Sequence, residues 1–431
     1  MGRYGYVALL VVCLGWFAYQ SLRVAPQDDP ATVVIWSGWG EQSPAFELYH
    51  QWWNELEREQ GIKITHVSLK NEVMIQQANR SLALGGSPAL FQSFGGFGLA
   101  LQGRYGLLQD IRPEIKKRGW DKVLDQKWLD FVTFDGEFYG IPIEAATFGL
   151  LINETLFDAH GIAYPEDWES FVAACEAFLA AGVQPLLAAG REENGYGPWL
   201  STLHMRFAGA DHYVEAIHGK TPFQNEAVAR AFDTFRQFYR QGYFGSQLLG
   251  MDWEACRQAF YQGKGAMLYS GNWEAWGVIN FAPQFDYRMF RFPTPPDGLG
   301  NEWDLLGGSN TTWVVPRNSQ KHEATLAYLD MIADHERLKA LANKIYYIVP
   351  LKETYLDSTN HPLHRSIAAR AHEARQIYNN LSVAAAPAIN RVYHQSFLAH
   401  ALGRMDFDEA SLRIQSAIDG YYARQQRRRG L

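Results

Sequence analysis

The sequence is poor in cysteine and has no metal-binding motif. Its 431 residues include three cysteines, Cys13, Cys175 and Cys256. It contains no CxxC or HExxH pattern, and its 13 histidines are scattered, so we expect no metal site, no cofactor and no metal-dependent catalysis. Cys175 and Cys256 fall on apolar faces of helical patterns, which favours buried free thiols over a disulfide.

Positive charge is also scarce. The formal net charge is −7, whereas a general nucleic-acid binder needs a basic surface to offset phosphate charge. The arginines near the C-terminal end, Arg424 and residues 427–429, are typical of a solvated tail. We therefore expect no nucleic-acid partner.

Long apolar runs are absent after the first twenty residues. The one strong run extends from Tyr6 to Tyr19, behind Arg3 and ahead of a polar segment. It is shorter than the roughly 20 residues of a membrane-spanning helix, and it matches the apolar core of a secretory signal. Residues 1–30 are therefore predicted to direct the protein to the periplasm or another extracytoplasmic space. An uncleaved anchor that tethers the chain to the inner membrane is the alternative.

The length and the strand pattern indicate an α/β protein with more than one lobe. A chain of 431 residues exceeds one ordinary core. Strand patterns at 32–36, 62–69 and 88–93 alternate with helical patterns, and a βαβαβ order calls for a parallel sheet covered by helices. The stretch 293–300 is rich in proline and glycine and is the best candidate for a linker.

Several short segments occur in an order that resembles a known family. Each is weak alone, but together they resemble the sugar-binding subunits of ABC importers, of the maltose-binding-protein type. Two departures are Ala89, where the family usually has aspartate, and the absence of a second tyrosine before Asn153. The matching segments are Ala83–Leu90, Gly106–Asp110, Asp135–Pro142, Leu150–Asn153, Pro165–Phe171, Phe260–Met267 and Gly271–Trp273.

The resemblance implies a fold and a function. The fold is the type II periplasmic-binding-protein fold, in which two α/β lobes are joined by a hinge of two or three crossing strands and close on a ligand. Lobe 1 is expected to comprise residues 31–143 and 300–350, and lobe 2 residues 144–299 and 351–431. The implied protein is a monomer without enzymatic activity. It captures a mono- or oligosaccharide and delivers it to ABC permease subunits in the membrane.

Candidate ligand-binding residues follow from a rule that is independent of the family. In open α/β sheets, ligands lie beyond the carboxyl ends of strands. Aromatic rings stack on the apolar faces of sugars, and amides and carboxylates bind their hydroxyls. The aromatic candidates that this rule selects are Trp36, Trp39, Phe94 and Trp273, and Trp199 and Tyr347 are further candidates for the cleft. The remaining candidates are Glu41, Gln42, Gln92, Glu144, Asn272, Gly308 and Asn310. Core packing is an open alternative for Trp36, and a hinge role for Glu144.

Two other functions remain open from the sequence. The same fold binds non-sugar solutes, such as a polyamine or a phosphate ester. The selected loops contain neither arginine nor lysine, which favours a neutral ligand over an anionic one. A carbohydrate hydrolase would need two facing carboxylates, and Glu41 and Glu144 are the pair to consider.

Overall fold

The computed structural model describes residues 32–41, 43–69, 71–84, 86, 88–246, 248–319, 322–352 and 361–429. The predicted export signal and Gln42 lie outside these ranges. Within them, the helices are too short or too polar to cross a membrane. The two predicted free thiols, Cys175 and Cys256, are buried and unpaired, which confirms that prediction.

The chain begins with the predicted βαβαβ unit. It consists of β1 (Thr32–Ser37), α2 (Phe46–Gln60), β2 (Lys63–Ser68), α3 (Asn71–Leu84) and β3 (Leu90–Ser93). Strand β1 lies between β2 and β3 and runs parallel to both, so the expected parallel sheet is confirmed. The sequence pattern predicts that the first helix begins at Ser43–Pro44, but α2 begins at Phe46. The reason is a turn in which the Phe46 amide donates to the Ser43 carbonyl.

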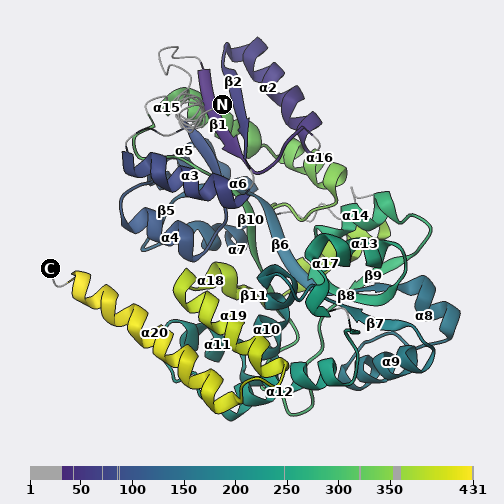
Figure 1. The fold of residues 1–431 in the computed structure, drawn as a ribbon. Helices are drawn as coiled ribbons and strands as arrows, with labels where there is room; N and C mark the ends of the chain where they lie inside the picture. Colours follow the sequence, from purple (N-terminus) through teal and green to yellow (C-terminus); the bar gives the residue numbers. More distant parts are fainter. Residues whose placement is uncertain are drawn as a thin grey trace, which may run out of the picture.

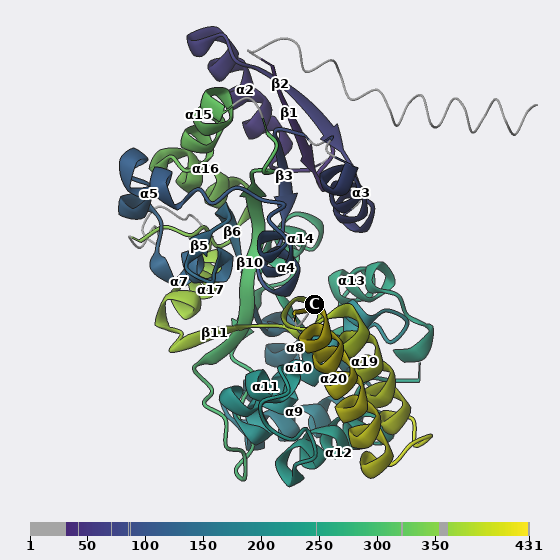
Figure 2. The ribbon, with the colours of Figure 1, turned by 90° about the vertical axis from the view of Figure 1, so that its left-hand side faces the viewer.

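Two long antiparallel strands connect the upper and lower parts of the molecule (Figures 1 and 2). They are β6 (Gly140–Asn153) and β10 (Asp304–Val314), which pair from Gly307 opposite Thr147 to Val314 opposite Gly140. The sheet order is β2-β1-β3-β10-β6-β8-β7, with β9 on β6 and β11 on β10. These further strands are β7 (Gln184–Leu187), β8 (Gly265–Gly271), β9 (Tyr287–Phe290) and β11 (Gln376–Asn379).

A third segment crosses beside β6. The Ile348 carbonyl accepts a hydrogen bond from the Ala145 amide at 2.9 Å, and Leu351 forms a bridge with Leu124. Residues 346–351 therefore run along the side of β6 that is not paired with β10. Three crossing segments agree with the two or three that the resemblance implies.

The hydrophobic residues form separate cores above and below the crossing strands. The upper core gathers buried residues from 33–143 and 313–351 with Ala368, and the lower core gathers residues from 148–292 and 381–418 with Leu306. A third cluster contains Ala145 of β6 together with residues of β8, β10 and β11. This division is the basis of a two-lobed architecture.

Helices surround both cores (Figures 1 and 2). In the upper part they are α4 (Phe97–Arg104), α5 (Arg112–Arg118), α6 (Trp120–Val123), α7 (Gln126–Leu129), η1 (Asp130–Val132), α15 (His322–Ile332) and α16 (His335–Ile345). In the lower part they are α8 (Glu154–His160), α9 (Trp168–Ala180), α10 (Glu193–Ala208), α11 (Ala210–Ile217), α12 (Glu226–Arg240), η2 (Leu248–Gly250), α13 (Trp253–Tyr261), α14 (Glu274–Phe281), α18 (Leu381–Ala384), α19 (Pro387–Ala401) and α20 (Phe407–Arg429). Helix α17 (Pro362–Glu373) lies between the two parts, with Ala368 in the upper core and Ile367 in the third cluster.

Two local sequence patterns have the backbone geometry that their residue types favour. Asp135 and Gly136, with φ of 53° and 80°, form the tight turn between β4 (Thr133–Phe134) and β5 (Glu137–Phe138), as an Asp-Gly pair favours. Asp167 caps α9, because its side chain accepts a hydrogen bond from the Ser170 amide at 2.8 Å.

Candidate functional site

Six of the predicted ligand-binding residues line one pocket of about 190 Å³. They come from the ends of β1 and β3, from the crossing strands and from the third crossing segment, as the strand-end rule predicts. We call this the strand-end pocket. Its predicted members are Trp39, Gln92, Phe94, Glu144, Asn310 and Tyr347, and its other described members are Gly38, Ser43, Pro44, Ala45, Thr311 and Ile345.

A chain of hydrogen bonds forms the polar wall of the strand-end pocket. The Gln92 side chain accepts from the Gly38 amide at 2.6 Å and donates to the Thr311 hydroxyl at 2.9 Å. Thr311 in turn donates to a Glu144 carboxylate oxygen at 2.6 Å, and the Asn310 amide donates to the same oxygen at 3.2 Å. This chain fixes the carboxylate at the junction of β6 and β10, so Glu144 holds the hinge strands together and also faces the pocket.

Burial determines the electrostatics of this wall. The Glu144 side chain is only 4% exposed, and burial raises its pKa, although the hydrogen bonds from Thr311 and Asn310 oppose the rise. Burial also raises the pKa of the Tyr347 hydroxyl, and the carboxylate of Glu144 raises it further. The pocket therefore presents the neutral hydroxyl of Tyr347 beside the carboxyl group of Glu144, whose ionisation is disfavoured by burial.

Trp39 provides the aromatic wall. Its ring stacks on Tyr49 with centroids 4.2 Å apart and planes inclined by 23°, and it meets Trp313 edge-on at 5.6 Å. Tyr49 and Trp313 are buried, whereas Trp39 is half-buried. The core thus supports an indole that remains partly open to the pocket, which is the arrangement a stacking platform needs.

Asn272 and Trp273 follow β8 directly and are not among the residues that line the strand-end pocket. Their side chains differ in exposure. The Asn272 side chain is 1% exposed. It accepts from the Thr147 amide at 2.9 Å and donates to the Ala145 carbonyl at 3.2 Å. These two hydrogen bonds join the end of β8 to β6. The prediction that the Asn272 side chain is available to hydrogen-bond a ligand is therefore corrected. Trp273 is half-buried and its ring lies edge-on to Phe148 at 5.1 Å.

Other predicted residues lie away from the strand-end pocket. Trp36 is partly buried against the upper core, which supports its alternative packing role. Glu41 is exposed and Gln42 lies outside the described residues. Trp199 is 0% exposed in the lower core, where α10 packs it against Phe244 and Phe292. The expectation that Trp199 contacts ligand is therefore corrected, because its ring has no open face.

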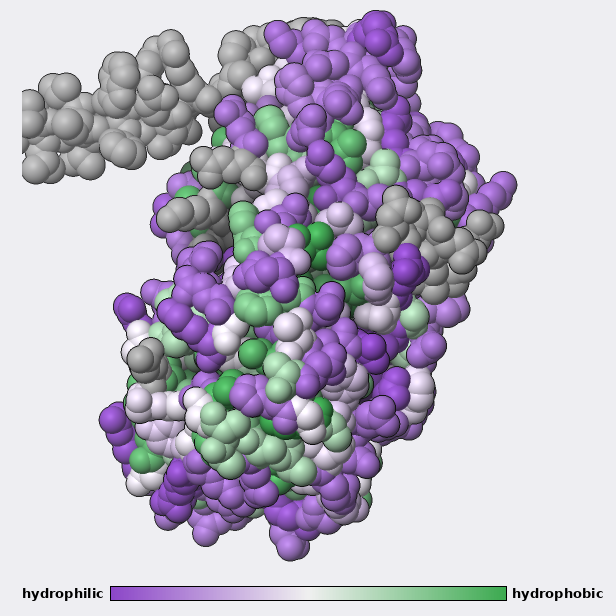
Figure 3. All heavy atoms as spheres, turned by 90° about the vertical axis from the view of Figure 1, so that its right-hand side faces the viewer, coloured by the Kyte–Doolittle hydropathy of each residue, from purple (hydrophilic) through white to green (hydrophobic). Residues whose placement is uncertain are grey.

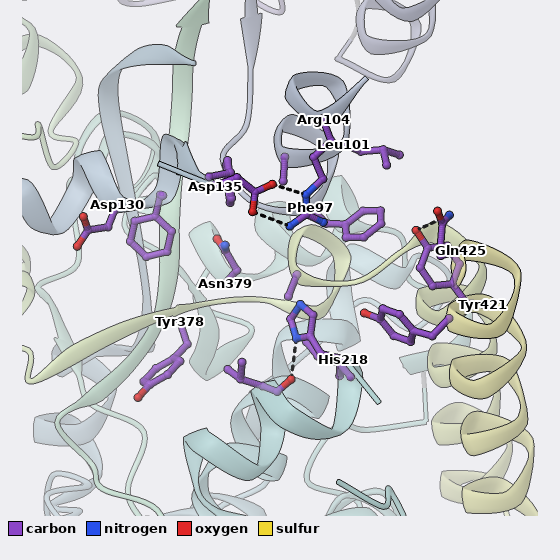
Figure 4. Close-up of a pocket in the computed structure, with 18 of the residues that line it drawn as sticks. Phe97, Leu101, Arg104, Asp130, Asp135, His218, Tyr378, Asn379, Tyr421 and Gln425 are labelled. Atoms are coloured by element: carbon purple, nitrogen blue, oxygen red, sulfur yellow. Dashed lines mark hydrogen bonds and ion pairs between the residues drawn. The ribbon is translucent and has the colours of Figure 1, made fainter. Parts of the chain in front are cut away.

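A larger cavity of about 950 Å³ lies between α4, α20 and β11 (Figure 4). Two of its polar groups bond within the protein: Arg104 pairs with Asp135 at 2.7 Å, and His218 bonds the Val214 carbonyl at 2.7 Å. Predicted Gly308 belongs to this side, since a Cβ there would meet Asn379 and Phe131, which line the cavity.

Sequence reasoning missed Thr311 and Tyr49. Thr311 follows the selected Asn310 directly, and its hydroxyl was not considered because a threonine in a strand pattern is usually read as a β-former. Tyr49 matches the apolar face of α2, and it is indeed 1% exposed. Its role under Trp39 depends on the packing of a helix against a loop, for which one sequence carries no signal.

Comparisons with known proteins identify the family of the chain. A family model described as bacterial extracellular solute-binding protein matches residues 39–337, which is more than half of the chain. A protein of Mesorhizobium japonicum described as a probable sugar-binding periplasmic protein is 23% identical over 326 residues, covering 73% of this chain and 76% of that protein.

Solved structures show the same fold. A structure concerned with xylan utilisation by Caldanaerobius polysaccharolyticus superposes with a TM-score of 0.81 and 21% identity, covering 89% of this chain and 99% of the other. A chitin oligosaccharide binding protein gives a TM-score of 0.76 and 20% identity, with 87% and 94% covered. The predicted two-lobed fold is thereby confirmed. The chain belongs to the family of bacterial extracellular solute-binding proteins.

Proposed function

We propose that this protein captures a carbohydrate in the strand-end pocket and delivers it to the permease of an ABC importer. The observation that carries the proposal is the supported indole of Trp39 beside the chain Gln92–Thr311–Glu144. A sugar ring has apolar C–H faces and many hydroxyls, so it needs both a stacking surface and fixed hydrogen-bonding groups. The names of the relatives, which mention sugar and chitin oligosaccharide, support the same ligand class.

Closure of the two lobes would complete the site. The described members of the strand-end pocket belong to the proposed lobe 1 and the crossing segments, 31–143 and 300–350 with Glu144. Lobe 2, 144–299 and 351–431, supplies Trp273 at the end of β8. The pocket volume of about 190 Å³ is below the roughly 300–1,000 Å³ of typical ligand pockets. It suits one sugar ring, with Trp273 as the second aromatic surface.

A cationic solute is the second candidate. Glu144 is the one carboxylate among the described residues that line the strand-end pocket, and Trp39, Phe94 and Tyr347 accompany it. Aromatic faces and a carboxylate attract ammonium groups, so a polyamine fits this chemistry. A phosphate ester fits poorly, because the described lining residues include no arginine or lysine. A glycosidase needs a second carboxylate across the bond that is cleaved, and exposed Glu41 does not line the pocket.

We further propose that the protein is a monomer. The view in Figure 3 shows mainly hydrophilic residues around the edge of this face, with some apolar residues in the upper half and more of them in the middle of the lower half. Large exposed apolar side chains are spread over distant elements, such as Leu84 of α3, Phe281 of α14 and Leu412 of α20. Single exposed apolar residues of this kind do not make an interface. Light scattering after size exclusion tests the assignment, and a dimer mass would overturn it.

A thermal-shift screen tests the proposed function. Xylo-, chito- and malto-oligosaccharides, galactose-containing trisaccharides and the polyamines putrescine and spermidine are added to the purified protein. A true ligand raises the melting temperature by an amount that grows with its concentration. We expect a shift with at least one sugar. A shift with a polyamine and none with any sugar would contradict the carbohydrate assignment, and release of shorter sugars would contradict the absence of enzymatic activity.

A further inference from the structure

The last helix of the chain ends in a cluster of arginines that follows its packed part. Helix α20 runs from Phe407 to Arg429, and Ile418 is the last of its described residues that is fully buried. Tyr421 and Tyr422 are half-buried and are the last described residues that pack against the lower core. The arginines at positions 424 and 427–429 therefore come after the residues that hold the helix to the body of the protein.

These arginines belong to a regular helix. The sequence alone is typical of a solvated tail, whereas α20 stays helical as far as Arg429. Positions 424, 427 and 428 are spaced i, i+3 and i+4, so they share one face of the helix. Arg424 and Arg427 are exposed. Figure 1 shows this end of α20, marked C, projecting beyond the neighbouring helices, and in Figure 2 the same end lies in front.

The positive charge at this end has no acidic neighbour to offset it in the part of the chain that the structure describes. Residues 420–431 contain four arginines and no acidic residue. Arg424 and Arg427 form no ion pair with a described residue. Arg413, three turns earlier on the same helix, instead pairs with Glu409 at 2.6 Å. The end of α20 is thus a concentrated, uncompensated positive charge.

The rest of the chain carries the opposite charge. The sequence as a whole has 46 acidic and 39 basic residues, a net charge of −7. Because residues 420–431 account for four of the basic residues, residues 1–419 contain 46 acidic and 35 basic residues, a net charge of −11. This separation of charge orients the molecule towards an anionic surface with the end of α20 foremost.

The position and chemistry of this end favour a lipid bilayer as the anionic surface. A guanidinium group binds the oxygens of a phosphate through paired hydrogen bonds, and clusters of four or more basic residues on a helix are typical of segments that bind anionic lipids. A projecting helix end touches an extended surface before the neighbouring helices do. The chain belongs to an extracellular family, so the phosphates it meets are lipid headgroups rather than nucleic acid.

We propose that the end of α20, from Arg424 to Arg429, is a docking surface for a bilayer that contains anionic phospholipids. Each basic side chain near such a surface strengthens binding about fivefold, so four together strengthen it by a factor on the order of several hundred. The contact is electrostatic and reversible, and it concentrates the protein at the membrane. The inference does not depend on the ligand of the strand-end pocket.

Vesicle sedimentation tests the proposal. The full chain is mixed with vesicles of phosphatidylcholine alone, and with vesicles in which one lipid in three is phosphatidylglycerol. The apolar run Tyr6–Tyr19 binds both kinds of vesicle alike, so the readout is the ratio of the two affinities. We expect a ratio on the order of 100 in favour of the anionic vesicles at about 0.1 M salt, falling towards one at about 1 M salt, where charges are screened within about 3 Å. Equal affinities at low salt would overturn the proposal.

Three variants assign the preference to α20. R424Q/R427Q/R428Q/R429Q should lower the ratio about tenfold or more, whereas lysine at the same four positions should keep most of it, because the charge remains. The matched control removes four exposed positive charges that are paired with acidic residues, and should change the ratio by about twofold at most. It is R58Q/R112Q/K117Q/R413Q.

Each variant can also contradict the proposal. An unchanged ratio in the glutamine variant would show that the arginines of α20 do not contact the bilayer. An equal loss in the control would show that only the net charge of the protein matters. An equal loss in the lysine variant would show that the charge of these positions is not responsible. Any of these three results overturns the docking surface, whatever the sugar measurements show.

Discussion

The hydroxyl of Thr311 lies 2.6 Å from a carboxylate oxygen of Glu144, and so joins the two long crossing strands inside the strand-end pocket. Glu144 is buried, and its ionisation is therefore costly in the folded protein. Because Glu144 joins the crossing strands and also lines the pocket, changing it should affect both the stability of the protein and its affinity for ligand.

The first prediction concerns the pH dependence of stability. Burial raises the pKa of Glu144 above its ordinary value of 4.5, so in this pH window the folded protein binds the proton more tightly than the unfolded chain. The free energy of unfolding therefore falls as pH rises from the ordinary pKa through the raised pKa. Above the raised pKa it stays lowered by the full cost of ionising the buried Glu144. E144Q has no ionisable side chain at this position, so its stability does not fall in this way. Without ligand we expect E144Q to be more stable than the unmodified protein at pH 7 to 8, with the difference disappearing below about pH 4.

Urea unfolding at several pH values measures this difference. Thr311→Val serves as the matched variant, since it removes the hydrogen bond and keeps the carboxylate. It should lose stability at all pH values above the raised pKa. A stability difference between E144Q and the unmodified protein that grows as pH is lowered would have the wrong sign for a raised pKa.

The second prediction concerns the stacking platform. Trp39→Ala should weaken sugar binding about 30-fold, the effect of losing roughly 2 kcal/mol at a central tryptophan. Trp303→Ala is the control, because Trp303 is 36% exposed and lies outside the pocket. Calorimetry with the best sugar of the screen measures both. Equal affinities of the two variants would remove Trp39 from the site.

The third prediction tests whether Asn272 stabilises the contact between β8 and β6 or binds the ligand. Asn272→Ala leaves the buried Thr147 amide without its side-chain partner, which costs roughly 1–3 kcal/mol, and the second lost bond adds to this. We expect the free energy of unfolding to fall by about 2–3 kcal/mol, measured by urea titration. Unchanged stability combined with lost binding would show instead that the amide serves the ligand.

The fourth prediction concerns the lower core. Trp199 is fully buried among aromatic rings, so Trp199→Ala should reduce stability by about 3–5 kcal/mol. Trp199→Phe should cost less, because it leaves a smaller cavity. The sugar affinity of the folded Trp199→Phe variant should be unchanged. A large loss of affinity in that stable variant would return Trp199 to the site.

The sequence was sufficient where position along a strand determines position in space. The ends of parallel strands share one edge of a sheet, and so Trp39, Gln92 and Phe94, which are far apart in the chain, were predicted to meet. The βαβαβ order and the Asp135–Gly136 turn are also set by local pattern, and both were predicted correctly.

The sequence did not predict whether a side chain near the cleft contacts the rest of the protein or remains available to a ligand. Asn272 satisfies two backbone groups of β6, and this depends on the register between β6 and β8, which has no local signature. Trp199 follows a proline inside α10, and it was only a further candidate for the cleft. The burial of its ring results from the packing of several helices and becomes visible only in three dimensions.

The most direct test of the strand-end pocket as the sugar site is a calorimetric titration of the purified protein with the sugar that gives the largest thermal shift, alongside Trp39→Ala and E144Q. We expect binding of one sugar per chain, a weakening of about 30-fold in Trp39→Ala, and about 10-fold or more in E144Q, since hydrogen bonds to a charged group contribute roughly 1.5–3 kcal/mol. Binding of a sugar with the same affinity in all three proteins would contradict the assignment of the strand-end pocket as the ligand site.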